Sequence, residues 1–507
     1  MKNIAQIFQT SAEQFGSKPA LISDGLTLSY TELAERSLRL AAALVVLGVK
    51  PGDRITLYSP NCWEWIVSYY GGLMAGAVVN PINVMLTPEE VGHIAKDCGA
   101  SVVMGSQEKL VSIVELKNNG TVRDLICFGD SVPAGMTAFA QLVEQGDVSR
   151  FSIVEREAQD SCTIGYTSGT TGHPKGAVHS HQNVVMNAQL TALMHGRSEA
   201  DCVVTALPLP HVYGTVVMNS TFINGGTLVV HPRFDEVSVL TSIQQYKATL
   251  FEGVPTMYFF LLNHPDLNQF DLSSLRICTV GGQTMPVAKM QQVEEQFGCP
   301  LVELWGMTEL AGLGTTFSHN GPIKHGSIGV PLPYCKAKIV DVADVSKTLA
   351  EDEVGELMIK GPVVMQGYYG NEAATQETIE GDGWLHTGDV AKIDEDGFIF
   401  IVDRKKDLIL TAGYNVYPAE IERVVAAHPD VAMVAVGPIA DEVKGELAKA
   451  YIVPKKNSSP SADSIMDYCR EHLAAYKVPR AVQFVDDFPK TSSGKIMRRK
   501  LRELDLV

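Results

Sequence analysis

The first third of the chain alternates between short apolar runs and longer stretches with apolar side chains at helical spacing. Residues 53–58 predict a buried strand, and residues 63–74 predict a helix. A further helix is expected from about residue 30 to Leu47, where Gly48 ends it. Strands that alternate with helices in this way are typical of parallel sheets covered by helices. We therefore expect an α/β fold over residues 1–160.

The helix expected at 63–74 contains four aromatic side chains, Trp63, Trp65, Tyr69 and Tyr70. A cofactor-binding cluster is one interpretation of this group. Helical spacing favours packing in the core instead, and no catalytic constellation precedes Tyr166.

Residues 166–176, Tyr-Thr-Ser-Gly-Thr-Thr-Gly-His-Pro-Lys-Gly, interrupt the apolar pattern between two short strand-like runs. Five hydroxyl-bearing side chains and three glycines cannot bury an apolar face, so the stretch predicts a loop. Glycines let backbone N–H groups approach a ligand, hydroxyls donate hydrogen bonds, and Lys175 adds positive charge, which together favour phosphate binding. The stretch fits neither the Walker pattern nor Gly-x-Gly-x-x-Gly, and a solvated linker is the alternative.

Two further stretches predict ligand contacts in the middle of the chain. His211 follows the strand expected at 203–206, and α/β proteins usually bind ligands at strand ends. A single histidine is more often structural, so this residue alone decides nothing. The apolar run 275–280 ends in Gly281 and Gly282, which suit either the close approach of a flat ring or a plain turn.

Composition narrows the class of protein. The 507-residue chain has 41 Lys and Arg against 58 Asp and Glu, and this net charge of −17 argues against a nucleic-acid partner. The nine cysteines are scattered without Cys-x-x-Cys pairs, which favours a reducing cytoplasm. No run of 18 apolar residues occurs, so we expect no transmembrane segment. Monomer and homodimer both remain open.

Five motifs resemble signatures of the adenylate-forming superfamily, which contains acyl-CoA synthetases, luciferases and peptide-synthetase adenylation domains. The loop at 166–176 is similar to its phosphate-binding signature, and Trp305-Gly-Met-Thr-Glu309 to its adenine- and metal-binding motif. Trp384-Leu-His-Thr-Gly-Asp389 resembles the ribose-binding motif, and Asp403-Arg-Lys-Lys-Asp407 the interdomain hinge. Lys490-Thr-Ser-Ser-Gly-Lys495 resembles the C-terminal signature with the adenylation lysine. The resemblance extends over nearly the whole chain.

The resemblance implies roles for individual residues. The nucleotide is expected to contact Thr167, Ser168, Gly169, Thr170, Thr171, Gly172, Lys175, Gly282, Gln283, Glu303, Leu304, Trp305, Gly306, Met307, Asp389, Arg404 and Lys495. Catalytic roles are implied for His211, Thr308, Glu309 and Lys495, with Glu309 as the ligand of Mg²⁺. The acyl pocket is implied at His211, Tyr213, Val217 and Gly281, although Val217 equally fits a plain core position. Lys406 is implied as the pivot of the hinge, and Gly413 as a neighbour of the pantetheine tunnel.

The same resemblance implies the domain organisation. Residues 1–402 are expected to form a large N-terminal AMP-binding domain with helix-covered parallel sheets and a β-barrel-like subdomain. Residues 403–407 are expected to form the hinge. Residues 408–507 are expected to form a small, mobile α+β domain, the C-terminal domain of AMP-binding enzymes, which carries the adenylation lysine.

The implied activity is that of an ATP-dependent carboxylate–CoA ligase that uses ATP, Mg²⁺ and coenzyme A. The carboxylate and ATP form acyl-AMP and pyrophosphate, and attack by the CoA thiol then releases AMP. One alternative is a free-standing enzyme that loads a carrier protein, although residues 211–220 lack the aspartate typical of amino-acid activation. A catalytically silent nucleotide-binding protein is another.

The acid is less determined by the sequence. His211-Val-Tyr213 resembles the His-x-Tyr of hydroxycinnamate ligases, whereas bacterial fatty-acyl ligases are similar overall. Gly214, Val217 and Gly281 imply an apolar pocket without a fixed charge, which disfavours dicarboxylates. Glu303 stands where plant hydroxycinnamate ligases often have glutamine, so the aryl assignment stays open. We therefore expect either an aryl acid or a medium- to long-chain fatty acid.

Overall fold

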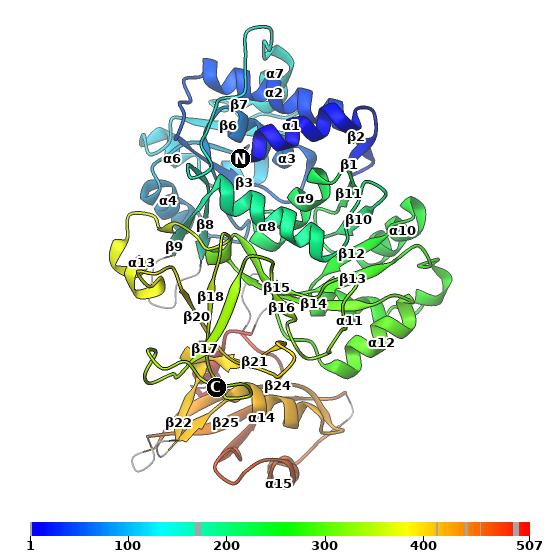
Figure 1. Ribbon diagram of the computed structural model, residues 1–507, viewed down its shortest axis with the longest axis vertical. Coiled ribbons are helices and arrows are strands. Elements are labelled where there is room, and N and C mark those ends of the chain that lie inside the picture. The colour runs from blue at the N-terminus through cyan, green and yellow to red at the C-terminus, as the bar shows by residue number, and fades with distance from the viewer. Residues whose placement is uncertain are drawn as a thin grey trace. The chain divides into compact units, whose positions relative to one another are not determined.

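The computed structural model describes residues 3–167, 174–411, 414–441, 445–456, 458–489 and 496–506. The chain divides into two compact units. The first comprises Met1–Lys336 and Ile359–Leu385, and the second comprises Ala337–Met358 and His386–Val507. Figure 1 labels their helices and strands.

The first unit contains a sheet whose eight described strands follow the order β19-β9-β8-β4-β3-β5-β6-β7. These strands are β3 (Arg54–Tyr58), β4 (Val78–Pro81), β5 (Ala100–Ser106), β6 (Asp124–Phe128), β7 (Thr137–Ala138), β8 (Ser161–Thr167), β9 (Lys175–Ser180) and β19 (Gly367–Tyr368). The strands from β8 to β7 pair in parallel. At the other edge, β9 pairs antiparallel with both β8 and β19.

A second sheet of the first unit has, within the described residues, the order β16-β15-β14-β13-β12-β10-β11-β1-β2. Its strands are β1 (Pro19–Ser23), β2 (Leu26–Ser29), β10 (Cys202–Thr205), β11 (Thr227–Val230), β12 (Leu250–Gly253), β13 (Ile277–Val280), β14 (Leu301–Met307), β15 (Gly312–Thr316) and β16 (Val330–Pro331). The strands from β14 to β1 pair in parallel, and β15, β16 and β2 add antiparallel edges. The parallel sheets expected from the sequence are thus confirmed.

Helices cover both sheets, as the alternating pattern requires. Those of the first unit are α1 (Ile4–Phe15), α2 (Tyr30–Val46), α3 (Trp63–Met74), α4 (Pro88–Asp97), α5 (Gln107–Val111), α6 (Glu115–Asn118), α7 (Phe139–Gln145), α8 (His181–Met194), α9 (Val212–Ile223), α10 (Glu236–Tyr246), α11 (Pro255–Leu262), α12 (Val287–Phe297) and α13 (Glu372–Thr378). Short 3₁₀ turns occur at η1 (Leu267–Gln269) and η2 (Thr308–Leu310). Helix α8 contacts β8 and β9 of one sheet and β15 of the other, so it lies between them (Figure 1).

Local sequence explains where these helices begin. Ser29 caps α2, because its hydroxyl accepts from the amide of Glu32 while the Glu32 carboxylate accepts from the amide of Ser29. Ser180 and Asn183 form the same reciprocal pair at the start of α8. Both caps satisfy amide groups that the first turn of a helix leaves without partners.

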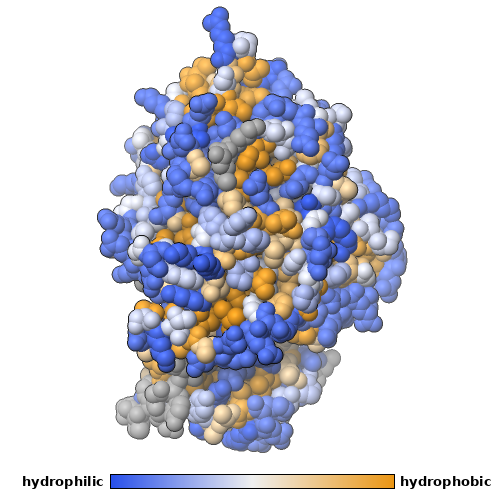
Figure 2. Space-filling model, in the orientation of Figure 1, coloured by the Kyte–Doolittle hydropathy of each residue, from blue (hydrophilic) through white to orange (hydrophobic). Residues whose placement is uncertain are grey.

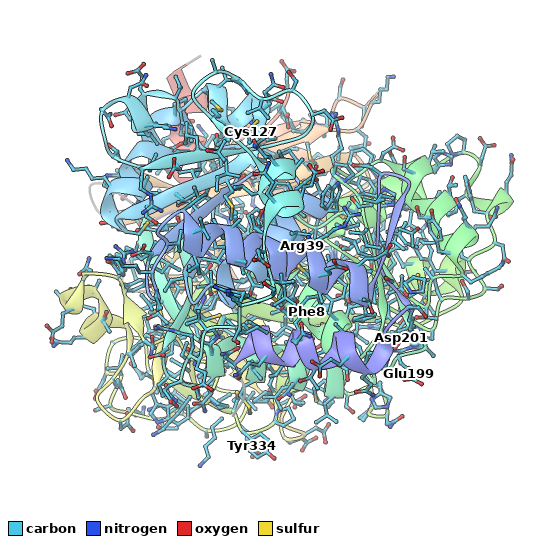
Figure 3. The ribbon with its side chains drawn as sticks, turned by 90° about the horizontal axis from the view of Figure 1, so that it is seen from above. Phe8, Arg39, Cys127, Glu199, Asp201 and Tyr334 are labelled. Carbon is cyan, nitrogen blue, oxygen red and sulfur yellow. The ribbon has the colours of Figure 1, made fainter. Side chains whose placement is uncertain are left out.

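The aromatic helix expected at residues 63–74 is α3, with the same bounds. Trp65, Tyr69 and Tyr70 are fully buried, and Trp65 stacks on Tyr69 with the ring centres 5.6 Å apart. Tyr70 also stacks on Phe8 of α1, a helix that runs alongside α2 (Figure 3). These contacts confirm core packing for Trp65, Tyr69 and Tyr70, whereas Trp63 is half-buried, with its ring against Arg36 and Phe139.

The second unit contains two smaller sheets in its described part. β17 (Lys336–Val340), β18 (Gly355–Lys360), β20 (Leu385–Ile393) and β21 (Ile399–Arg404) form the first. The other has the order β23 (Tyr414–Val416), β22 (Ile409–Thr411), β25 (Gly445–Pro454) and β24 (Val431–Asp441), with β26 (Ala481–Phe484) beside β25. Helices α14 (Pro418–Ala426) and α15 (Ala462–His472) and the 3₁₀ segments η3 (Lys405–Asp407) and η4 (Arg498–Leu506) complete the unit.

The two compact units do not coincide with the expected domains, because 337–358 and 386–402 join the second unit. The expected boundary at 402/403 concerns where the chain bends during the reaction, so it stays a prediction. Within the described residues, no helix is long and apolar enough to cross a bilayer. Hydrophilic residues cover most of the face shown in Figure 2, with smaller groups of hydrophobic residues between them.

Candidate active site

The predicted phosphate loop joins the two strands of a hairpin, β8 and β9. The strands are antiparallel, with Thr167 opposite Lys175. The strands expected on either side of the loop are therefore confirmed. The loop residues Ser168, Gly169, Thr170, Thr171 and Gly172 lie outside the described residues, and their roles stay predictions.

The hairpin lies directly against Thr308, at the turn that follows β14. A Cβ atom on Gly165 of β8 would be 2.7 Å from Thr308 Cγ2, so this position requires glycine. His179 of β9 donates from Nε2 to the Thr308 carbonyl oxygen at 2.7 Å, and its Nδ1 accepts from Thr163 Oγ1 at 2.9 Å. Burial lowers the pKa of His179 to about 4, so the ring is neutral and the arrangement of donor and acceptor is fixed.

Glu309 places a buried carboxylate beside the same hairpin. Tyr368 Oη donates to Glu309 Oε1 at 2.7 Å, and the Met365 amide donates to the Glu309 carbonyl oxygen at 2.8 Å. Lys175 Nζ lies 5.1 Å from the centre of the Tyr368 ring, within cation–π range. The structure therefore brings together Thr167, Lys175, Thr308 and Glu309, which the sequence places about 140 residues apart.

The oxygen atoms at this turn fit Mg²⁺, which prefers carboxylates together with substrate phosphates and water. Glu309 offers a carboxylate that is only 8% exposed, and Thr308 offers a neighbouring hydroxyl. No group of three or more His, Cys, Asp or Glu side chains suited to a metal is found in the described part of the chain. A metal held by Glu309 would therefore take its other ligands from phosphate and water.

The residues predicted to bind adenine lie at neighbouring strand ends. A Cβ atom on Gly281 would be 2.3 Å from Leu304 Cδ1, so the end of β13 packs directly on β14. Gly282 has a φ of +83°, in the left-handed region that favours glycine. Gly282, Gln283 and Gly306 are exposed, Trp305 and Met307 are half-buried, and Leu304 is buried. Their contacts with a nucleotide stay a prediction.

Glu303 is a buried carboxyl group on β14. Its Oε2 accepts from the Gly326 amide at 3.1 Å. Burial raises the pKa of Glu303 to about 7, although backbone hydrogen bonds oppose the shift. This candidate nucleotide contact can therefore change its charge near neutral pH.

The candidates for the acyl pocket gather on α9 and β13. His211 is the N-cap of α9, where its Nδ1 accepts from the Tyr213 amide at 3.2 Å, so it begins a helix six residues after β10 ends. Tyr213 and Val217 are buried on α9. The Tyr213 hydroxyl contacts Thr279 Oγ1 at 2.6 Å, two residues before Gly281. Tyr213 and Gly281 are thus brought to the same end of β13.

A buried network of hydrogen bonds and one ion pair supports the Tyr213 hydroxyl. Thr279 donates to Glu252 Oε2 at 2.7 Å, and Glu252 forms an ion pair with Arg197, which is also close to Thr221. Glu252 and Arg197 are almost fully buried, and their opposite charges compensate each other. We call Tyr213, Thr279, Glu252 and Arg197 the α9 network. It leaves the Tyr213 hydroxyl engaged within the protein.

The second unit brings together two other residues that are predicted to bind the nucleotide. Asp389 of β20 lies opposite Arg404 of β21, and Arg404 Nε is 3.3 Å from Asp389 Oδ1. Lys406, the expected pivot, is exposed in η3. Gly413 and Lys495 lie outside the described residues.

Four side chains at the candidate site were not predicted from the sequence: His179, Arg197, Glu252 and Tyr368. His179 and Tyr368 lie in short strands next to glycine-containing segments, without a recognisable spacing. Arg197 follows α8 and Glu252 lies in β12, 55 residues further along, so only the tertiary fold brings them together. A lone glutamate in an apolar run, as in residues 250–255, was the one signal that could have indicated a buried ion pair.

Comparison with known proteins agrees with this geometry. The family model of the AMP-binding enzyme matches residues 8–369, and that of the AMP-binding enzyme C-terminal domain matches residues 420–495. A long-chain-fatty-acid–CoA ligase of Bacillus subtilis (strain 168) is 35% identical over 99% of this chain and 94% of its own length. A feruloyl-CoA synthase of an Amycolatopsis species is 36% identical over 94% of both chains.

A solved structure gives the same result for the fold. The anthranilate CoA ligase AuaEII, in complex with anthranoyl-AMP, superposes with a TM-score of 0.91 at 30% identity, covering 99% of this chain and 97% of its own. The expected α/β fold and reaction class are thereby confirmed, together with the need for ATP, Mg²⁺ and coenzyme A. The chain belongs to the AMP-binding enzyme family, as an AMP-forming acyl-CoA ligase of the adenylate-forming superfamily.

Proposed function

We propose that this ligase activates an apolar monocarboxylic acid and that Lys175, Thr308, Glu309 and Lys495 act on ATP. The carboxylate oxygen attacks the α-phosphorus of ATP, and pyrophosphate leaves as acyl-AMP forms. The CoA sulfur then attacks the acyl carbonyl carbon, and AMP leaves. The first step gathers negative charge on phosphate oxygens, so fixed positive charge and hydrogen-bond donors accelerate it.

The contacts around Thr308 are the observation that supports this assignment of residues. Lys175 lies over the ring of Tyr368, whose hydroxyl binds Glu309, and His179 holds the backbone carbonyl of Thr308. Mg²⁺ bound at Glu309 would neutralise phosphate charge in the same place. Asp389 would accept hydrogen bonds from the two ribose hydroxyls, and Arg404, its cross-strand partner, would reach ribose or phosphate.

The α9 network supports the proposal of an apolar acid. Tyr213 presents its ring while its hydroxyl is engaged by Thr279, and the charge of Glu252 is compensated by Arg197. A pocket beside α9 would therefore offer apolar surface and no free charge to a second carboxylate. The names of two relatives point to the same acid classes, a long-chain fatty acid and a hydroxycinnamic acid.

A panel of carboxylic acids tests the proposal. Acetate, hexanoate, palmitate, benzoate, ferulate and malonate would each be assayed for CoA-dependent AMP formation. We expect the highest kcat/KM with one of the large apolar acids, hexanoate, palmitate, benzoate or ferulate. Preference for malonate would contradict the proposal, as would AMP formation that needs a carrier protein in place of CoA.

We also propose a reducing compartment, the cytoplasm, as the place of action. All nine cysteines are free, and six of them are buried. Thiols without a disulfide framework are typical of reducing compartments.

A further inference from the structure

Tyr368 lies in a segment whose backbone is held by contacts with β9, Thr375 and Asn183. It lies on β19, where it pairs with Ala177 of β9, and its amide donates to Thr375 Oγ1 at 2.9 Å. The preceding residues are held by Asn183, whose Nδ2 donates to the carbonyl oxygens of Pro362 and Val364 at 2.8 and 2.9 Å. The side chain of Tyr368 therefore starts from a well-defined backbone.

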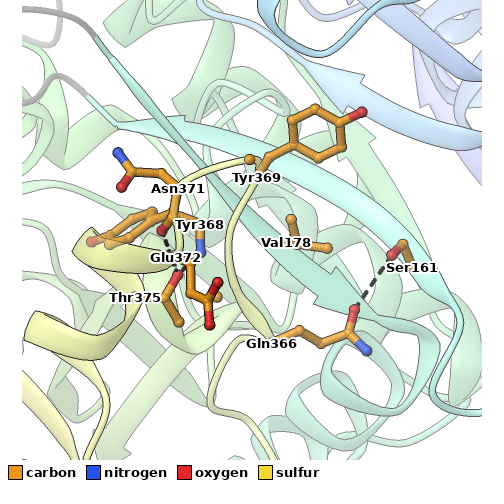
Figure 4. A pocket seen from close by; sticks show the side chains of 10 residues that line it. Ser161, Val178, Gln366, Tyr368, Tyr369, Asn371, Glu372 and Thr375 are labelled. Atoms are coloured by element: carbon orange, nitrogen blue, oxygen red, sulfur yellow. Dashed lines mark hydrogen bonds between the residues drawn. The ribbon is translucent and has the colours of Figure 1, made fainter.

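Tyr368 and its neighbour Tyr369 point to opposite sides of their strand (Figure 4). The segment borders an open surface pocket of about 560 Å³, lined among others by Ser161, Val178 and Glu372. The Tyr368 hydroxyl reaches the buried Glu309 carboxylate. Tyr369 instead packs against the core cluster of the first sheet. Two adjacent tyrosines thus have different surroundings, which provides a matched control.

The hydroxyl of Tyr368 donates a hydrogen bond to Glu309, with 2.7 Å between Tyr368 Oη and Glu309 Oε1. The same segment holds the backbone of Glu309 through the Met365 amide. One carboxylate oxygen of Glu309 is therefore held in a fixed orientation.

The ring of Tyr368 contacts Lys175 at the same time. The ammonium nitrogen is 5.1 Å from the ring centre, a distance at which the face of an aromatic ring attracts a cation. Tyr368 therefore contacts the Lys175 ammonium with its ring and the Glu309 carboxylate with its hydroxyl.

We propose that Tyr368 is a positioning residue for adenylation: its hydroxyl orients Glu309 for Mg²⁺, and its ring supports Lys175 for the nucleotide phosphates. The inference rests on the proposed role of Glu309 as the metal ligand. Groups that hydrogen-bond a metal-binding carboxylate typically change metal affinity or activity by about 10- to 100-fold when removed.

The variant Tyr368→Phe tests this inference, with Tyr369→Phe as the control. ATP affinity would be measured calorimetrically with Mg²⁺ and with EDTA, and Mn²⁺ binding in the ATP complex by electron paramagnetic resonance. We expect Tyr368→Phe to weaken metal binding about tenfold or more, while ATP affinity in EDTA stays within about twofold of the original. Conversion of supplied acyl-adenylate to thioester stays unchanged. Tyr369→Phe behaves as the original protein in all four measurements.

A second variant separates the ring from the hydroxyl. Tyr368→Leu removes both, so ATP affinity in EDTA falls several-fold as well. Equal losses with Mg²⁺ and with EDTA in Tyr368→Phe, or equal losses of both half-reactions, would show a merely structural role and overturn the inference.

The variant Glu309→Gln distinguishes failure of the inference from failure of the proposed function. If Glu309→Gln loses metal binding while Tyr368→Phe keeps it, the inference alone is wrong. If Glu309→Gln keeps metal binding, the assignment of Glu309 is wrong and the inference falls with it.

Discussion

Glu303 and His179 are buried titratable side chains whose pKa values shift in opposite directions. Burial raises the pKa of Glu303 to about 7 and lowers that of His179 to about 4. Between about pH 4.5 and 6.5, folded Glu303 holds a proton that the unfolded chain has lost, and folded His179 lacks one that the unfolded chain binds. As the pH rises in this range, the titration of Glu303 therefore lowers the free energy of unfolding, and the titration of His179 raises it. The two effects oppose each other in this range.

The variant Glu303→Gln isolates one of these effects. Glutamine is neutral at every pH, so the free energy of unfolding should increase relative to the original protein as pH rises from about 4.5 to about 7. The difference should reach about 3 kcal/mol above pH 7, at about 1.36 kcal/mol per unit of pKa shift. Urea unfolding at pH 5, 6, 7 and 8 measures it. Glu295→Gln, at an exposed position of α12, is the control; a difference for Glu303→Gln that does not vary with pH would refute the raised pKa.

Helix α9 depends on groups that lie outside it. Its residue Tyr213 is joined through Thr279 of β13 to Glu252 of β12, and Arg197 follows α8. The network therefore ties the helix to two strands of the second sheet. Removal of one member of a buried ion pair leaves an uncompensated charge, whereas removal of both leaves none.

A double-mutant cycle tests this arrangement. Glu252→Leu leaves the Arg197 guanidinium buried without its partner, so we expect a loss of about 3–5 kcal/mol in the free energy of unfolding. The double variant Arg197→Met with Glu252→Leu should recover most of that loss, because no charge remains buried. Urea unfolding of the original protein, both single variants and the double variant measures the coupling. Additive effects of the two single changes would contradict a compensated pair.

Elements were more predictable than the contacts between them. The spacing of apolar residues gave α3 with its observed bounds, and the hydroxyl- and glycine-rich run indicated the connection between β8 and β9. His211 follows a strand as expected, yet it caps α9, because the intervening prolines carry the chain away from β10 first. Tyr368 shows the limit of prediction from the sequence. Its strand has two residues, and its hydrogen-bond partner Glu309 lies 59 residues away. Hydrophobic periodicity does not encode such a pairing.

At the scale of the whole molecule, two half-reactions share one chain, and their requirements differ. Adenylation needs positive charge at the α-phosphate, whereas attack by the CoA thiol needs access to the acyl carbonyl. The sequence motif around Lys495 indicates that residues 408–507 contribute to the first step. One lysine about 4 Å from the reacting phosphate supplies about 4 kcal/mol at an effective dielectric near 20.

The variant Lys495→Ala separates these requirements. Formation of acyl-adenylate should fall about a thousandfold, because about 4 kcal/mol of stabilisation is lost. Conversion of supplied acyl-adenylate to thioester should stay close to the original rate. Pyrophosphate release measures the first step and thioester formation the second, with Lys500→Ala, a nearby lysine in η4, as the control. Equal loss of both rates would contradict separate roles for the two steps.

Asp403 opens the segment 403–407 in which the hinge is expected, and its carboxylate is buried. It accepts hydrogen bonds from the Ala419 amide at 2.7 Å and from Arg498 Nη1 at 3.1 Å, both beyond the hinge in sequence. If the chain bends at Lys406, as the sequence predicts, the bend has to separate the Asp403 carboxylate from the Arg498 guanidinium. Acid or high salt weakens that attraction. Either condition would then speed the domain rotation that separates adenylation from thioester formation.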